Sequence, residues 1–399
     1  MFFRPRAICV NPPCVSIHFW FVYLIAVVFN FQALLVGYSA PTFIEQFVQP
    51  STVGILYALG AAGSIMVFLT IPYLLRVWGN VTMSIVLMAA SLATLSVFSA
   101  GFSPTITIAA LLLFLVINPL LYLHIDVFSE TLIGKNEAGT GHKRGLALAL
   151  MSVAALLAPL SISILAGESG NLIPVFWLAQ MVGLIFIVII IAIFRNFYDP
   201  AYSVVKVRTL LKTAWTQYDL RIVLSTHFLL QVFFTWTVVF IPLYLVSEVG
   251  LSWTAVGTII AAGLFAYVIF EYPVGILADD YIGEKEMMAL GFLVLALTMA
   301  GVTAVGAAAT WVWMTLMFIS RFGASMVEVT TESYFFKKVS GSDAAVISLF
   351  RLMRPLGSVL GALLGSAALL VLPFHLAFLV LAATMTIGIF LSLFLHDTR

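Results

Sequence analysis

Charged residues are scarce in this sequence. Only 9% of its 399 residues are Asp, Glu, Lys or Arg, whereas 63% are hydrophobic. A water-soluble protein carries about a quarter charged residues, so this composition excludes a soluble globular protein. The formal net charge is only +1, which argues against nucleic acid as a partner because nucleic-acid binding requires a strongly basic surface.

Cysteine and the short motifs of cofactor chemistry are also nearly absent. The two cysteines, Cys9 and Cys14, lie near the N-terminus. Their spacing allows a disulfide or half a metal site, but two free thiols beside a membrane helix are the simpler interpretation. The sequence has no P-loop, no glycine-rich dinucleotide fingerprint and no His-Glu-x-x-His motif. We therefore expect no cofactor, no metal and no enzymatic activity. A membrane enzyme is a remote alternative because the sequence lacks a catalytic motif, and a channel is a remote alternative because it lacks a repeated pore-lining ring.

The sequence contains many long runs of apolar residues. A helix needs about 20 apolar residues to cross the hydrocarbon core of a bilayer. The sequence predicts twelve such helices, at 16–38, 51–74, 81–101, 104–126, 145–166, 172–194, 223–246, 254–277, 287–305, 310–332, 344–367 and 373–395. The first follows Arg4 and Arg6, as the apolar part of a signal peptide would, but it is too long for one. We expect it to be retained as a helix.

The longest polar interval separates the twelve predicted helices into two sets of six. We predict an N-terminal six-helix bundle (1–194), a linker (195–222) and a C-terminal six-helix bundle (223–399). Within the linker, Val204–Ala214 interleaves basic and apolar residues, which is typical of a short helix lying on the inner membrane surface. The predicted fold class is an all-α membrane protein built of two six-helix bundles.

Two short patterns repeat between the predicted halves. Asp126-x3-Glu-x4-Lys, which leaves the fourth helix, recurs 202 residues later as Glu328-x3-Glu-x4-Lys, which leaves the tenth. Arg76-Val-Trp-Gly, after the second helix, aligns at an offset of 204 with Asp280-Tyr-Ile-Gly, after the eighth. The second half therefore repeats the first.

Basic residues mark one side of the predicted bundle. Of the 18 Lys and Arg residues, fifteen fall on a single side, and the others, Arg321, Arg351 and Arg354, fall within predicted helices. The opposite loops hold acids, among them Glu45, Glu168 and Glu248. The positive-inside rule therefore predicts a multi-pass protein of the cell membrane with both termini and the linker in the cytoplasm.

The polar stretch between the eighth and ninth predicted helices reads Gly275-Ile-Leu-Ala-Asp279-Asp280-Tyr-Ile-Gly283-Glu-Lys285. Because it lies between two membrane spans, we expect a tight turn at the membrane face. Gly275 would let a neighbouring backbone approach closely, and Gly283 can take the positive φ of a sharp reversal. The Asp279 carboxylate can cap the end of an adjacent helix or meet an arginine from it.

This stretch resembles the Gly-x-x-x-Asp-(Arg/Lys)-x-x-Gly-x-Lys loop signature of the major facilitator superfamily of transporters, with Asp280 in place of the usual basic residue. In the first half the signature is degraded, because Ile71 and Leu75 stand where Gly and Asp are expected. The resemblance, which covers the whole chain, implies two pseudo-symmetric six-helix bundles that rock about a central site by alternating access. It implies that the third, sixth, ninth and twelfth helices face lipid and the others enclose the cavity.

The expected partners are a small-molecule substrate, the lipid bilayer and protons, and the protein is expected to act as a monomer. Gly145, Ala154, Ala158 and Pro159 in the fifth helix resemble, in degraded form, the Gly-x8-Gly-x3-Gly-Pro pattern of superfamily antiporters that export drugs. This favours proton-coupled efflux. A passive facilitator and a proton symporter for a polar metabolite remain alternatives.

Two charges lie deep within predicted helices. A charge near the bilayer centre costs about 2.5–3.5 kcal/mol on insertion scales, so it requires a partner or an aqueous cavity. Arg321 in the tenth helix could bind a polar or anionic group of the substrate, or could be fixed in a structural ion pair. Glu271 in the eighth helix suits a group that loads and unloads protons, or could be a structural acid. We predict that Glu271 and Arg321 form the coupling pair.

Further charges gather near the cytoplasmic ends of the predicted helices. Arg351 and Arg354 enter the eleventh helix where Glu328 and Glu332 leave the tenth. We expect these four to form an inner-side gate, with direct substrate contact as the alternative; breaking one member would strand a desolvated charge, so the gate would be two-state. The other predicted gate and loop residues are Arg76, Asp126, Glu130, Gly275, Asp279, Gly283 and Lys285.

Uncharged polar residues complete the candidate cavity. They are Asn30 and Gln32 in the first helix, Asn118 and Tyr122 in the fourth, and His227, Gln231 and Trp236 in the seventh. Each could form a hydrogen bond with a substrate. Each could equally join two helices, a contact worth about 0.6 kcal/mol in a membrane protein.

Overall fold

The computed structural model describes residues 15–133, 140–200, 216–306, 309–338 and 344–396. Within these ranges the regular elements are all helices, and twelve segments are long and apolar enough to cross a membrane. The prediction of twelve spans and of an all-α membrane protein is confirmed. The predicted linker helix, Val204–Ala214, lies outside the described residues.

The first six spans are formed by five helices. They are α1 (Val15–Glu45), α2 (Pro50–Ala100), α3 (Pro104–Ile133), α4 (Thr140–Ala166), followed by a short 3-10 turn η1 (Gly167–Ser169), and α5 (Ile173–Ile193). The long α2 contains two spans, Pro50–Phe68 and Tyr73–Ala100, and reverses direction at Gly79. The first span ends at Glu45, seven residues beyond its predicted end, so its polar end reaches the membrane face opposite the termini.

The second six spans follow the same order. They are α7 (Tyr218–Ser247), α8 (Trp253–Ile276), a π-helical turn η2 (Leu277–Ile282), α9 (Glu284–Val302), α10 (Thr310–Lys338), α11 (Ala344–Val371) and α12 (Phe374–Leu393). Of the twelve spans, that in α7 is the most enclosed, with 78% of its most apolar window buried, and that in α5 the least, with 28%. The low burial of α5 fits its expected lipid-facing position.

Two glycines mark corresponding points of the halves. Gly79 has φ 75° and ψ 163°, and Gly283 has φ 111° and ψ 146°. A side chain strongly disfavours this region, so glycine is required at both reversals. The residues that follow, Asn80 and Glu284, are both buried, at 0% and 2% exposed. The sequence repeat at an offset of 204 therefore corresponds to a repeated backbone geometry.

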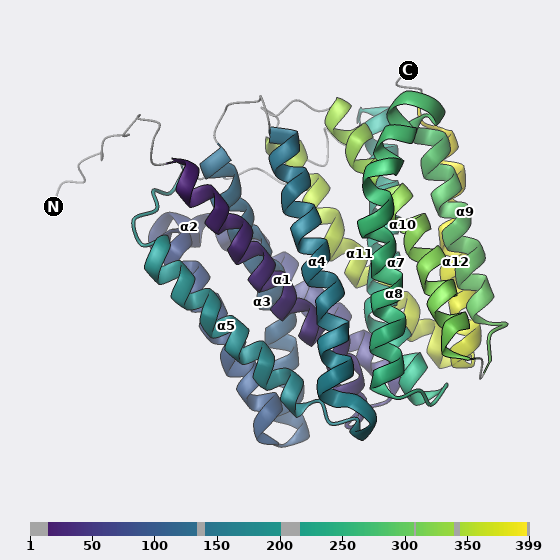
Figure 1. The fold of residues 1–399 in the computed structure, drawn as a ribbon, viewed down its shortest axis with the longest axis horizontal. Coiled ribbons are helices and arrows are strands. Elements are labelled where there is room, and N and C mark those ends of the chain that lie inside the picture. Colours follow the sequence, from purple (N-terminus) through teal and green to yellow (C-terminus); the bar gives the residue numbers. More distant parts are fainter. Residues whose placement is uncertain (1–14, 134–139, 201–215, 307–308, 339–343, 397–399) are drawn as a thin grey trace.

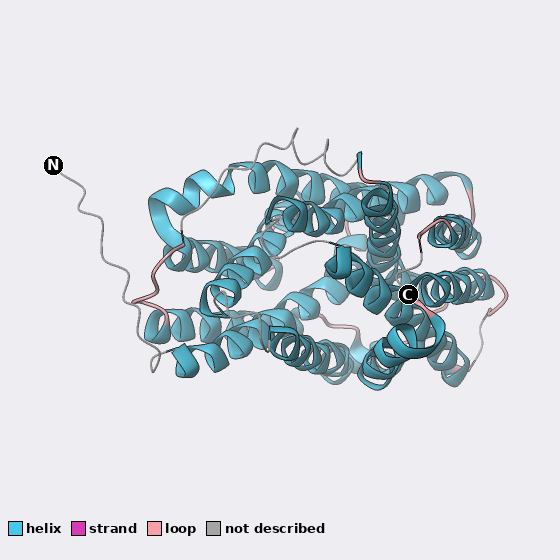
Figure 2. Cartoon of the chain, turned by 90° about the horizontal axis from the view of Figure 1, so that it is seen from above, coloured by secondary structure: helices cyan, strands magenta, loops and turns pink. Residues whose placement is uncertain are grey.

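The two sets of helices lie side by side (Figure 1), and Figure 2 shows them from one end. We call the end at which α1 begins and α12 ends the termini end, and the opposite end the far end. The sets contact each other mainly through α2 against α11, α4 against α8, and α1 against α7. This contact zone, which we call the seam, is where a site shared by the two halves would lie.

Candidate functional site

Arg321 is buried near the middle of α10, with 5% of its surface exposed. Its Nη1 donates a hydrogen bond to Thr237 Oγ1 of α7 at 2.9 Å, and its guanidinium lies 5.4 Å from the centre of the Phe233 ring. On the other side, Gly263 of α8 leaves room for its stem, because a Cβ built there would lie 3.3 Å from Arg321 Cγ. Three helices therefore fix this cation.

Glu271 and Arg321, the predicted coupling pair, lie on helices α8 and α10, which pack against each other. Among the described residues, no ion pair joins Arg321 to Glu271, and the hydrogen-bond partner of Arg321 is the Thr237 hydroxyl. Glu271 lies two turns beyond Gly263 on α8 and is half-buried. That the two residues act as the coupling pair stays a prediction.

Three carboxyls lie between Arg321 and the termini end. Glu328 and Glu332 follow Arg321 along α10, and Glu271 lies on the adjacent α8; all three are half-buried. The charges of Glu332, Glu271, Arg354 and Arg321 all act on the Glu328 carboxyl. Gaining or losing one proton in this cluster would therefore change the electrostatic energy of several neighbours.

Two tyrosines that the sequence analysis missed complete this centre. Tyr267 lies one turn before Glu271 on α8, and its buried hydroxyl has no hydrogen-bond partner among the described residues. Tyr38 reaches the same place from α1 of the first half, and both hydroxyls lie in the electric field of Arg321. Tyr267 could have been identified from the sequence because it lies four residues, about one helical turn, before Glu271. No sequence pattern pointed to Tyr38.

At the termini end the seam is bridged by arginines of α11. Arg351 forms an ion pair with Asp126 of α3, and the Arg354 guanidinium lies 5.6 Å from the centre of the Tyr122 ring. The predicted grouping of Arg351 and Arg354 with Glu328 and Glu332 stays a prediction: the Arg354 charge acts on the Glu328 carboxyl, and both arginines also contact the first half. The two arginines reach the first half because α3 and α11 face each other across the seam at this end.

Tyr122 is itself held within the first half. Its hydroxyl donates to Asn30 Oδ1 at 2.7 Å, and Asn30 Nδ2 donates to the Met151 carbonyl of α4 at 2.8 Å. Asn30 and Tyr122 thus connect α1, α3 and α4 and form a rigid platform under Arg354.

At the far end the seam is closed by close helix packing. The Pro159 carbonyl and Ser163 of α4 abut Gly257 of α8, and Ser163 Oγ donates to the Thr254 carbonyl at 3.0 Å. A Cβ built on Gly54 of α2 would lie 2.9 Å from the Ala362 carbonyl of α11. The two ends of the seam therefore differ: glycines bring helices of the two halves into close contact at the far end, and an ion pair and a cation–ring contact join them at the termini end.

The loop-signature stretch forms no open turn. After α8 the chain continues through η2 and reverses at Gly283, whose positive φ agrees with the expectation. The expected close backbone approach at Gly275 is wrong, because a Cβ there would make an ordinary contact of 3.7 Å with Val329 Cγ1. The Lys285 Nζ atom lies 3.6 Å from Glu286 Oε1, so these two neighbours form an ion pair. The side chains of Asp279 and Glu130 lie outside the described residues, and Arg76 is exposed.

Glu284, which sequence analysis did not single out, is the buried acid of this turn. It forms an ion pair with Lys337 at the end of α10 and accepts a hydrogen bond from Ser333 Oγ at 3.3 Å. These contacts tie the start of α9 to the end of α10.

The predicted cavity residues divide into two groups. Gln32 and Trp236 make contacts within their own halves: Gln32 Nε2 donates to Ser91 at 3.4 Å in the first half, and Trp236 packs on Phe378 of α12 in the second. The remaining polar residues face other helices or the seam. His227 and Gln231 lie between α7 and α11, with the His227 ring stacked on Phe350, and Asn118 is half-buried on α3.

Comparison with known proteins agrees with this geometry. Residues 223–399 match the family model of the Major Facilitator Superfamily. Two crystal structures of the nucleoside transporter NupG are similar in fold, and each is 13% identical to this chain. One of them, a point variant of NupG, has a TM-score of 0.70, and the alignment covers 93% of this chain and 99% of the NupG chain. The other structure has a TM-score of 0.69, and the alignment covers 93% and 98% of the two chains. A search of curated proteins finds no match.

The twelve spans define a multi-pass membrane protein. Its second half, residues 223–399, carries the sequence pattern of the Major Facilitator Superfamily, and the whole chain has the fold of the two NupG structures.

Proposed function

We propose that this protein is a proton-coupled secondary transporter that moves a small polar solute by alternating access. Its two domains, 1–194 and 223–399, joined by the 195–222 linker, would rock about a site near Arg321. The termini end would face the cytoplasm across the cell membrane, as the distribution of basic residues predicts. Both domains lie in one chain, so a monomer contains the complete pathway.

The difference between the two ends of the seam is the observation that carries this proposal. At the far end, Gly257 and Gly54 allow helices of opposite halves to pack in close contact. At the termini end, the bridge from Arg351 to Asp126 joins two side chains that are 36% and 43% exposed. Such an ion pair contributes only about 0–1 kcal/mol. The termini end would therefore open more readily than the far end.

The carboxyl cluster beside Arg321 supports proton coupling. Glu271, Glu328 and Glu332 lie on two adjacent helices, and Glu328 is within the field of Arg321 and Arg354. A proton that enters this cluster neutralises one acid and leaves the arginines with more unbalanced positive charge. The affinity of the centre for solute would then depend on protonation, which is the requirement for coupling.

NupG, which shares the fold, is a nucleoside transporter. Nucleosides belong to the class of small polar solutes expected here, and the hydroxyls of Tyr38 and Tyr267 with the Arg321 guanidinium offer donors and acceptors for such a solute. Nucleosides are therefore the first solutes to test, followed by a thermal-shift screen of metabolites, since a ligand of the folded state raises the melting temperature.

Counterflow in proteoliposomes tests the proposal. Vesicles loaded with unlabelled uridine should take up labelled uridine transiently above equilibrium, and an imposed pH gradient should drive net accumulation. Counterflow without accumulation would identify a passive facilitator, and flux without counterflow would identify a channel. If no solute that binds in the screen shows counterflow, the transporter mechanism is wrong.

A further inference from the structure

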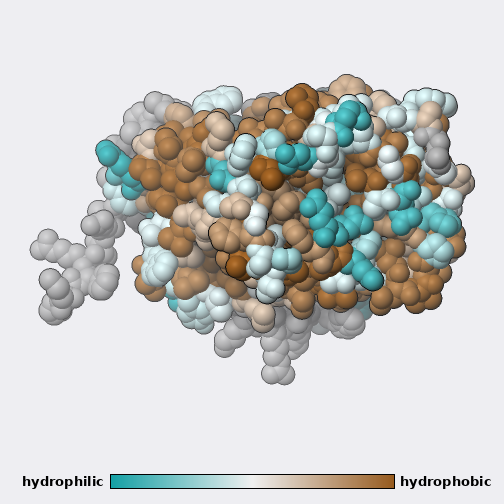
Figure 3. All heavy atoms as spheres, turned by 90° about the horizontal axis from the view of Figure 1, so that it is seen from below, coloured by the Kyte–Doolittle hydropathy of each residue, from teal (hydrophilic) through white to brown (hydrophobic). Residues whose placement is uncertain are grey.

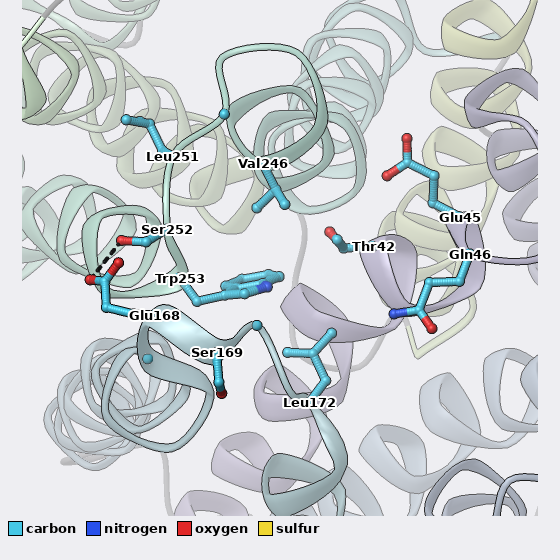
Figure 4. A pocket seen from close by; sticks show the side chains of 13 residues that line it. Thr42, Glu45, Gln46, Glu168, Ser169, Leu172, Val246, Leu251, Ser252 and Trp253 are labelled. Carbon is cyan, nitrogen blue, oxygen red and sulfur yellow. Dashed lines mark hydrogen bonds between the residues drawn. The ribbon is translucent and has the colours of Figure 1, made fainter.

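A cavity of about 730 Å³ lies at the far end, on the seam and outside the closely packed region. Thr42 and Glu45 at the end of α1 form one wall, Glu168 of η1 forms a second, and Ser252 and Trp253 at the start of α8 form a third (Figure 4). Figure 3, seen from this end, shows hydrophilic side chains gathered across the middle of an otherwise hydrophobic face. The far-end pocket is therefore built by both halves.

The ionisable side chains that line the pocket are acids. Glu45 and Glu168 line it from different helices, and no Lys, Arg or His is among the described lining residues. The charge of Glu248, on the α7–α8 connection, also acts on the Glu45 carboxyl. Like charges at the mouth of a cleft with apolar walls attract ions of the opposite sign.

A second observation points to a ligand. Thr42 is 9% exposed, and its Oγ1 has no hydrogen-bond partner among the described residues. In Figure 4 this oxygen is turned toward the space between Val246 and Trp253. A buried hydroxyl without a partner is costly, and a donor placed in the pocket would complete it. Glu168, by contrast, already accepts a hydrogen bond from Ser252 Oγ at 3.0 Å and keeps its other oxygen for a ligand.

The size of the pocket and its lining residues indicate which kind of cation it can bind. Among the described residues, no group of three or more His, Cys, Asp or Glu side chains could hold a metal ion. A volume of about 730 Å³ is in the range of pockets for small organic molecules. The Trp253 ring supplies an aromatic wall, and tryptophan is the best side chain for contact with an organic cation.

We propose that the far-end pocket is a binding site for small organic ammonium ions. Glu45 and Glu168 neutralise the charge from two walls, Trp253 contacts the alkyl groups, and the Thr42 hydroxyl accepts from an N–H or O–H of the ligand. Each contact uses a residue of the seam, so the bound cation joins the two halves at the far end.

Thermal unfolding of the purified full-length protein tests the site, with choline as probe and 3,3-dimethyl-1-butanol as its neutral isostere. Choline should raise the melting temperature in a saturable manner, and the isostere should not. The double variant Glu45→Gln/Glu168→Gln should weaken choline binding at least roughly tenfold. Glu286→Gln, which changes an exposed acid at the termini end, should leave it unchanged.

Equilibrium dialysis of labelled choline against the wild-type protein provides a measurement that needs no variant. Tetramethylammonium should displace choline, and acetate should not. The proposal is overturned if choline binding is not saturable, if the neutral isostere binds equally well, or if the double variant folds and binds as the wild type does. None of these results bears on nucleoside counterflow, so failure of this site and failure of the transport mechanism are distinguishable.

Discussion

Arg351 of α11 and Asp126 of α3 form an ion pair that crosses between the two halves of the chain at the termini end. The residues are 225 positions apart in the sequence. Arg354, one turn further along α11, lies over Tyr122, which is one turn before Asp126 on α3. Two successive turns of one helix thus touch two successive turns of the other, and this contact must separate when the termini end opens.

Loss of the ion pair should increase access from the termini end. We expect Asp126→Asn to raise the population open at that end up to about fivefold, because a half-exposed pair contributes about 0–1 kcal/mol. The rate at which an impermeant thiol reagent modifies Asn118→Cys, with Cys9 and Cys14 changed to Ser, measures this access. The exchanged pair Asp126→Arg/Arg351→Asp should restore the wild-type rate. Equal rates in all three proteins would show that this contact does not control opening.

Arg321→Ala should abolish binding of the transported solute. The buried guanidinium is held by α7 and α8, close enough to the carboxyl cluster for its charge to act on Glu328. Thr237→Ala removes only its hydrogen-bond acceptor, so it should weaken binding by about 1–3 kcal/mol. Solute affinity measured by thermal shift or by the half-saturation of counterflow separates the two. Unaltered affinity in Arg321→Ala would identify Arg321 as a structural residue.

Glu271→Gln should uncouple solute movement from the proton gradient. The amide keeps the size of the carboxyl but can neither bind nor release a proton, so exchange should persist while accumulation under an imposed pH gradient falls to the equilibrium level. Counterflow and gradient-driven uptake of the same solute, measured on one preparation, give both quantities. Glu286→Gln serves as the matched control. Accumulation at the wild-type level in Glu271→Gln would exclude Glu271 as the coupling acid.

The positions of the spans could be predicted because the signal is local. About 20 consecutive apolar residues are sufficient to define a membrane helix, and the repeated glycine at 79 and 283 lies within a short motif. The direction in which a side chain points could not be predicted in the same way. Gln32 and Trp236 lie on helices that are apolar on nearly every side, so the sequence does not show which side faces the seam, and both face their own half.

The sequence also did not show which residues of one half contact which residues of the other across the seam. Arg351 was expected to pair with acids of its own half, because the sequence places Glu328 and Glu332 close to it. Its ion-pair contact with Asp126 reaches the other half, since this contact depends on how the two halves meet. Tyr38 was missed for the same reason, because the contact of α1 with α7 of the other half brings its hydroxyl into the field of Arg321.

Gly257→Leu should prevent the far end from closing. The Cβ and the branched side chain would occupy the space of the Pro159 carbonyl and Ser163, and because both belong to the opposite domain, the clash is relieved by separating the domains rather than by unfolding either one. The population open at the far end should therefore rise, and Thr42→Cys should react faster with an impermeant thiol reagent added from that side. Gly275→Ala is the control, because a Cβ there meets only Val329 at an ordinary distance of 3.7 Å, and it should leave the reaction rate unchanged. If Gly257→Leu is folded and its Thr42→Cys form reacts at the wild-type rate, the contact between α4 and α8 is not the seal, and closure of the far end must depend on the packing of α2 against α11.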